Sequence, residues 1–262
     1  MGVAFVVVVL ASLGSRGHLR ADIGDAAQVV RAGSGTARIS ETVRYDDDHL
    51  RVEASDRVVG GRLESDLGAV GERDEHLWSL VSSVWPVADV ARVRQLNLVT
   101  DGVNGTLAMV HRSTMDPSTW IVSLDPAEPD DVLRRTLVHE LAHVHTLGRE
   151  DLTVVRADER CDGVRLVIGC ARSGSTLAAW AEAFWSDHHE PATDDRGRFV
   201  TAYAASSVPE DLAESFMVWT VGPGGSTRVL AADKAAFFAA RPELVQLRAD
   251  VRAKLGLDGA AA

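Results

Sequence analysis

Two histidines and a glutamate stand close together in residues 139–143, which read His-Glu-Leu-Ala-His. Positions four apart share one face of a helix, so His139 and His143 can direct imidazole nitrogens at a single point. Zinc binds histidine nitrogen at about 2.0–2.1 Å, which this spacing allows. Glu140 stands beside that point, where a carboxylate can accept a proton from a metal-activated water. The pattern therefore predicts a metal site capable of hydrolytic chemistry.

A catalytic zinc site of this kind needs a third protein ligand and one open position. The metzincin spacing is excluded, because Arg149 stands where that arrangement requires its third ligand. Glu210 and Glu214 are four apart on a predicted helix, so one could bind the metal while the other reaches a metal-bound histidine. The competing ligand candidates are Glu182, His188 and His189.

These two segments together resemble the gluzincin zinc metallopeptidases, in particular the anthrax lethal factor-type variant. In that variant a second glutamate follows the ligand glutamate by four residues and a tyrosine precedes it by seven, as Tyr203 precedes Glu210. The resemblance implies that Glu210 is the third zinc ligand, that Glu214 orients a histidine, and that Tyr203 stabilises an oxyanion. It covers only these short segments, and Glu214 stands where thermolysin-type members carry Asp.

The activity implied is hydrolysis of a peptide or protein substrate, with Zn²⁺ as cofactor and Glu140 as general base and then acid. An extended substrate is expected along an edge strand, for which residues 106–112 are the candidate. The alternative is a catalytically inactive zincin-fold protein that keeps zinc for recognition. Without the histidine motif, Glu210 and Glu214 would be interpreted as acids in the first turn of a solvated helix. Tyr203 would likewise be interpreted as an aromatic residue at the edge of the core.

The elements around these motifs predict an α+β, zincin-like fold: a small mixed sheet packed on the active-site helix, followed by a mainly helical C-terminal part. Alternating apolar residues predict strands at 94–100, 106–112 and 120–124, and a hairpin at 41–59 around the acidic turn 46–48. Helical spacing, caps and prolines define the predicted helices. They cover residues 76–84, 130–148 with Asp130 or Asp131 as cap, 175–185 with Ser173 or Ser175 as cap, 209–221, 231–240 and 242–255.

The domain organisation follows from the same pattern. Residues 41–262 are expected to form one metallopeptidase domain, with a sheet part at about 41–125 and a helical part at about 126–262. Residues 4–13 are apolar and uncharged, so residues 1–14 are predicted to be a signal peptide or anchor, with a buried strand as the alternative. Residues 15–40 are predicted to be a linker, and residues 15–90 could act as a prodomain. This organisation implies a secreted or cell-surface protein.

The net charge and the cysteine content limit the classes of binding partner and the cellular compartment that are expected for this chain. The net charge is -11, which opposes binding to nucleic acid and to anionic lipid, and leaves the N-terminal apolar segment as the only expected membrane contact. Cys161 and Cys170 are the only cysteines, and in an exported chain they are expected to form a disulfide that closes a local loop. Two reduced, buried thiols are the alternative for a cytosolic chain.

Overall fold

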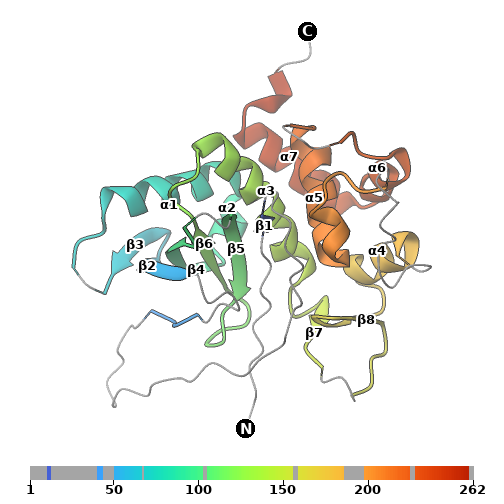
Figure 1. Ribbon diagram of the computed structural model, residues 1–262, viewed down its shortest axis with the longest axis horizontal. Coiled ribbons are helices and arrows are strands. Elements are labelled where there is room, and N and C mark those ends of the chain that lie inside the picture. The colour runs from blue at the N-terminus through green and yellow to red at the C-terminus, as the bar shows by residue number, and fades with distance from the viewer. Residues whose placement is uncertain are drawn as a thin grey trace. The chain divides into compact units, whose positions relative to one another are not determined.

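The computed structural model describes residues 11–12, 40–43, 50–66, 68–102, 105–155, 159–185, 198–224 and 228–259 (Figure 1). The chain divides into two compact units, one made by the residues up to Ser82 with Val87–Leu133, the other by Ser83–Pro86 with the residues from Arg134 onward. The predicted signal peptide or anchor and the predicted linker lie outside the described residues, apart from Ala11, Ser12 and Ser40. Among the described residues, no helix has the length and apolar character needed to cross a membrane.

The described residues form an α+β structure, as predicted, and the first unit contains a mixed six-stranded sheet. Its strand order is β1-β5-β6-β4-β2-β3, in which β4 and β6 are parallel and all other neighbours are antiparallel. The strands are β1 (Ala11–Ser12), β2 (Arg51–Val59), β3 (Arg62–Ser65), β4 (Val93–Thr100), β5 (Thr106–Arg112) and β6 (Trp120–Leu124).

The three central strand predictions are confirmed to within one residue, but two expectations about the sheet are wrong. Residues 41–43 are not in a strand, and β2 instead forms a hairpin with β3 through Gly60 and Gly61. These glycines have φ values of 58° and 79°, which a two-residue hairpin turn requires. The acidic turn 46–48 lies outside the described residues. In addition, β5 is not an edge strand, because β1 pairs with it at Thr106 and Ala108.

The two faces of the central strand β4 differ in chemistry because successive side chains point to opposite faces of a sheet. Leu96 and Leu98 are buried on one face, whereas Gln95 and Asn97 are buried on the other. Gln95 Nε2 donates to Asn97 Oδ1 at 2.9 Å, and Ser55 Oγ of β2 donates to the same oxygen at 2.7 Å. Hydrogen bonding along this polar face compensates the burial of its amide groups.

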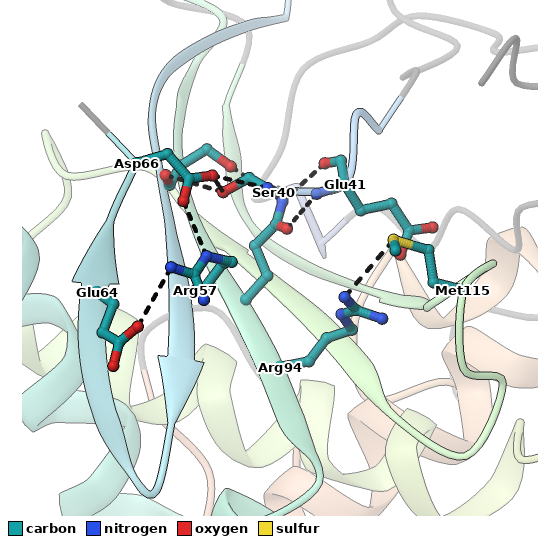
Figure 2. A network of polar contacts seen from close by, with 9 residues as sticks. Ser40, Glu41, Arg57, Glu64, Asp66, Arg94 and Met115 are labelled. Atoms are coloured by element: carbon teal, nitrogen blue, oxygen red, sulfur yellow. Dashed lines mark hydrogen bonds and ion pairs between the residues drawn. The ribbon is translucent and has the colours of Figure 1, made fainter. Parts of the chain in front are cut away.

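Residues 40–41 are tied to the polar side of the sheet by several contacts (Figure 2). The Ser40 backbone amide donates to Asp66 Oδ2 at 2.8 Å, and Arg57 Nε holds Asp66 Oδ1 at 2.9 Å. The Glu41 amide donates to Gln95 Oε1 at 2.6 Å. The Glu41 carboxylate accepts from Ser113 Oγ at 2.7 Å. This short segment therefore joins β2, β4 and the residues after β5.

Helix α1 (Glu72–Val84) begins four residues before the predicted start and ends ahead of Pro86, as expected. The Gly71 amide donates to Asp74 Oδ2 at 3.1 Å, the reciprocal half of a capping box, which explains the earlier start. Trp78 Nε1 donates to Gly61 O at 2.9 Å and joins α1 to the β2–β3 turn. The short helix α2 (Val87–Val90) was not predicted.

The second unit is mainly helical, and the helices expected there are confirmed to within about two residues at each end. Asp130 and Asp131 lie inside the first turn of α3, rather than capping it. A small antiparallel sheet of order β7-β9-β8 was not predicted. The elements are α3 (Asp130–Thr146), whose first turn belongs to the first unit, β7 (Leu152–Thr153), β8 (Val164–Leu166), β9 (Gly169–Ala171), α4 (Thr176–Phe184), η1 (Ala204–Ser206), α5 (Val208–Val221), α6 (Ala232–Ala239), α7 (Pro242–Lys254) and η2 (Leu257–Gly259).

Cys161 and Cys170 form the predicted disulfide, with a Cα–Cα distance of 5.5 Å. Cys170 lies in β9 and is buried, and it pairs in register with Arg165 of β8. The bond therefore closes a loop over the small sheet of the second unit, where short strands supply few ladder hydrogen bonds.

Replacing both cysteines, by Cys161→Ser with Cys170→Ala, is expected to lower the free energy of unfolding by about 2–3 kcal/mol, because the bond restricts a short loop in the unfolded chain. Urea denaturation measures the change, and wild-type protein treated with a reductant is the matched control. Two titratable thiols in unreduced, denatured wild-type protein would contradict the disulfide.

Candidate metal centre

Helix α3 presents His139 and His143 on one side, and both side chains are fully buried. Leu137 and Leu141 of the same helix are buried as well. Trp85 Nε1 donates to the Leu137 carbonyl oxygen at 2.7 Å, which anchors the helix two residues before His139. The two imidazoles are thus held by a helix that cannot readily rotate about its axis.

Helix α5 supplies the two glutamates predicted for this site. Ser207 caps its N-terminus by accepting from the Glu210 amide at 3.4 Å, and Pro209 lies in its first turn. Glu210 and Glu214 are 5% and 7% exposed, which contradicts the alternative of first-turn acids on a solvated helix face. Carboxylates are rarely buried without a partner, so these two require one.

His139, His143 and Glu210 bring three ligand atoms together. The two Nε2 atoms are 2.9 Å apart, and Glu210 Oε2 lies 3.0 Å from His139 Nε2 and 3.4 Å from His143 Nε2. A tetrahedral ion with bonds of about 2.0–2.1 Å separates its ligand atoms by about 3.3–3.4 Å, close to these values. Among the described residues, this is the group of three that could hold a metal ion.

The charges in this cluster are strongly coupled. Burial alone would lower the pKa of His139, but its hydrogen bonds to Glu210 and Glu214 outweigh burial and hold that pKa well above its ordinary value. Burial lowers the pKa of His143. Burial would raise the pKa of Glu210, yet the charge of His143 and the hydrogen bond to His139 bring it to about 2. Glu210 is therefore ionised at neutral pH and available to a cation.

Glu214 lies behind His139, on the side away from the other ligand atoms. Its Oε1 is 2.8 Å from His139 Nδ1, the distance of a charge-assisted hydrogen bond. In the neutral imidazole, a proton held on Nδ1 by a carboxylate leaves the lone pair on Nε2, the atom that faces His143 and Glu210. Glu214 therefore selects the imidazole tautomer that can bind a metal.

Tyr203 lies immediately before η1 and beside the cluster. Its ring centroid is 6.0 Å from that of His139. Burial, followed by the charges of Glu210 and Glu140, raises the pKa of Tyr203 well above its ordinary value, so the phenol keeps its proton. Glu140 is fully buried on α3 next to His139. Both residues singled out as catalytic thus belong to the surroundings of the three-ligand group.

The competing ligand candidates do not join this group in the described structure. Glu182 is exposed on α4 and is not part of the three-ligand group. His188 and His189 lie outside the described residues. Two further residues contribute to the surroundings of the site, Asp211 and Thr201. The sequence did not indicate them, because their main partners lie on other elements far along the chain.

Asp211 is fully buried one position after Glu210 and accepts four hydrogen bonds. Its Oδ2 accepts from Nε1 of Trp180, in the middle of α4, at 3.0 Å and from Nε1 of Trp185, immediately after α4, at 3.1 Å. Its Oδ1 accepts from Lys234 Nζ of α6 at 2.5 Å and from Ser215 Oγ at 3.4 Å. The network ties the first turn of α5, and with it Glu210, to α4 and α6.

Burial has opposite effects on the two charged members of this network. It raises the pKa of Asp211 and lowers the pKa of Lys234, while the attraction between the pair opposes both shifts. Lys234 Nζ also lies 5.2 Å from the centroid of the Trp180 ring and 5.1 Å from that of Phe199. Aromatic faces and one carboxylate therefore replace the water that a lysine ordinarily binds.

No family model, curated protein or solved structure matches this chain.

Lys234→Ala is expected to lower the free energy of unfolding by about 3–5 kcal/mol, because it leaves the Asp211 carboxylate buried without its counter-charge. The measurement is urea denaturation in the presence of a chelator, which removes any contribution from metal binding. The matched control is Lys254→Ala at the exposed end of α7, expected to change stability by less than about 0.5 kcal/mol. Equal losses in the two variants would show that the buried pair contributes little.

Proposed function

We propose that this chain is a zinc-dependent peptidase of the gluzincin type with a zincin-like fold. The observation on which the proposal depends is the buried convergence of His139, His143 and Glu210, whose ligand atoms lie 2.9–3.4 Å apart. Two imidazoles and one carboxylate form a ligand set used by catalytic zinc sites, which leave the fourth position for water or substrate. Structural zinc sites more often use four protein ligands, commonly cysteines, and both cysteines here are in the disulfide.

Zinc is favoured over harder cations by the chemistry of these ligands. Imidazole nitrogen suits zinc and its transition-metal neighbours, whereas calcium and magnesium prefer all-oxygen sites. Glu214 strengthens the case, because a carboxylate that accepts from the other ring nitrogen of a metal-binding histidine raises its basicity. Both features lie in buried surroundings, where His139, His143 and Glu210 are at most 5% exposed.

The proposed reaction is cleavage of a peptide bond by water. When bound, zinc supplies a Lewis acid that polarises the carbonyl and lowers the pKa of water to about 7. Glu140 accepts one proton from the attacking water as its oxygen bonds to the carbonyl carbon. Glu140 then donates that proton to the amide nitrogen as the carbon–nitrogen bond breaks. The products are a carboxylic acid and an amine, and at neutral pH the acid then passes its remaining proton to the amine or to solvent, leaving a carboxylate.

Tyr203 contributes a hydrogen bond to the carbonyl oxygen while negative charge develops there. The phenol retains its proton in this environment, so it acts as a donor. A donor aimed at an oxyanion in a dry site is worth about 2.7–4 kcal/mol, or a factor of 10²–10³ in kcat. Recognition alone does not require a general base or an oxyanion donor, so Glu140 and Tyr203 beside the three-ligand group favour the peptidase over the recognition alternative.

Glu140→Gln is expected to keep zinc bound and to abolish cleavage of a fluorogenic peptide library, because the amide cannot accept the proton of water. Elemental analysis measures the zinc, and the matched control is Glu182→Gln on the exposed side of α4, expected to keep full activity. Cleavage by Glu140→Gln at the wild-type rate would refute its role as base. A wild-type protein that holds zinc but cleaves no peptide would favour the recognition alternative.

Glu210→Ala is expected to remove one of three ligands and to lower zinc content well below one ion per chain after dialysis. Elemental analysis of the wild type, of Glu210→Ala and of Glu182→Ala provides the comparison. Full zinc occupancy in Glu210→Ala, with unchanged affinity, would mean that another residue is the third ligand.

A further inference from the structure

A single hydroxyl connects Glu214 to the turn that bears Tyr203. Thr201 Oγ1 donates to Glu214 Oε2 at 2.7 Å. The same oxygen accepts from the backbone amide of Ala204 at 2.9 Å. Thr201 is partly buried and lies before α5 in the chain. It is 13 positions away from Glu214 in the sequence.

The two partners fix the orientation of this hydroxyl. A carboxylate oxygen accepts hydrogen bonds, so the hydroxyl proton must point to Glu214. A backbone amide only donates, so the hydroxyl lone pair must point to Ala204. An apolar side chain of the same shape could fill neither role, whereas serine could fill both.

The first consequence concerns His139. Glu214 is held at both carboxylate oxygens, with Oε1 on His139 Nδ1 at 2.8 Å and Oε2 on the Thr201 hydroxyl at 2.7 Å. A carboxylate held at one oxygen can still rotate about its terminal torsion, which has a broad, shallow energy profile. Holding the second oxygen fixes the plane of the group, and therefore the direction in which His139 Nε2 faces.

The second consequence concerns Tyr203. The hydrogen bond from the Ala204 backbone amide to the Thr201 hydroxyl closes a turn over residues 201–204, and this turn includes Tyr203. The Ser206 amide then donates to the Tyr203 carbonyl oxygen at 2.9 Å, as η1 begins. The Tyr203 backbone is thus held from both sides, and its ring is kept beside His139.

We propose that Thr201 is a positioning residue that sets, through one hydroxyl, both the orientation of the metal-binding His139 and the placement of Tyr203. The part concerning His139 requires only a metal site. The part concerning Tyr203 rests on the proposed peptidase function. Thr201 does not touch the ligand atoms, so its influence on the metal passes through Glu214.

The test of the first part is Zn²⁺ affinity, measured by competition with a chromophoric chelator. Thr201→Val removes the hydroxyl while keeping the shape, and is expected to weaken zinc binding by roughly ten- to a hundredfold, the range seen when partners of metal ligands are lost. Thr201→Ser keeps the hydroxyl and is expected to bind zinc within about twofold of the wild type. Thr201→Ala replaces the valine variant if the latter does not fold.

A double-mutant cycle separates positioning from a general effect on packing. In a Glu214→Ala background, Thr201→Val should change zinc affinity by less than about twofold, because the hydroxyl has lost the group through which it acts. If Thr201→Val weakened zinc binding as strongly in the Glu214→Ala background as in the wild type, the proposal would be overturned. Equal losses of zinc affinity for Thr201→Ser and Thr201→Val would also overturn it, because the loss would then not depend on the hydroxyl.

Peptide cleavage at saturating zinc tests the second part. Thr201→Val is expected to lower kcat roughly tenfold or more, with little change in KM, and to have no further effect in a Tyr203→Phe background. A kcat equal to that of the wild type would refute the link to Tyr203. If the wild type cleaves no peptide, the proposed function fails, whereas the zinc-affinity cycle still decides the role of Thr201 at His139.

Discussion

The second unit depends on one electrostatic constraint: two imidazole nitrogens and a carboxylate oxygen are held 2.9–3.4 Å apart where water is excluded. Removing such groups from water costs several kcal/mol each unless their charges and lone pairs are compensated. A divalent cation compensates all three at once. The surrounding structure can be understood as the means of keeping these atoms close despite that cost, with one helix holding the histidines and another the acids.

The three acidic residues of α5 contact different partners, because successive residues point about 100° apart around a helix. Glu210 faces the histidines of α3. Asp211 faces α4 and α6, where two indoles and Lys234 bind it. Glu214, one turn on from Glu210, reaches His139 from behind. Glu210 is therefore flanked along α5 by Asp211, held in a buried ion pair, and by Glu214, hydrogen-bonded to His139.

Local patterns in the sequence were sufficient for strands β4, β5 and β6, for the longer helices, and for the shared faces of those helices. The 139–143 motif predicted the histidine pair, and the four-residue spacing of Glu210 and Glu214 predicted their common face. Contacts that depend on distant partners could not be read in this way. The pairing of Asp211 with Lys234 spans 23 positions, and that of Thr201 with Glu214 spans 13. The strands β7, β8 and β9 are too short for a periodic signal to emerge.

Helix α5 is enclosed on nearly every side, since all of its fourteen residues except Trp219 and Val221 are buried. In a helix without a solvent face, almost every substitution alters either volume or hydrogen bonding in a packed interior. Few positions of such a helix can therefore change without loss of stability. Natural variation is therefore expected mainly in loops and in other elements. The helix that carries Glu210 is expected to be among the slowest-changing parts of this chain over evolutionary time.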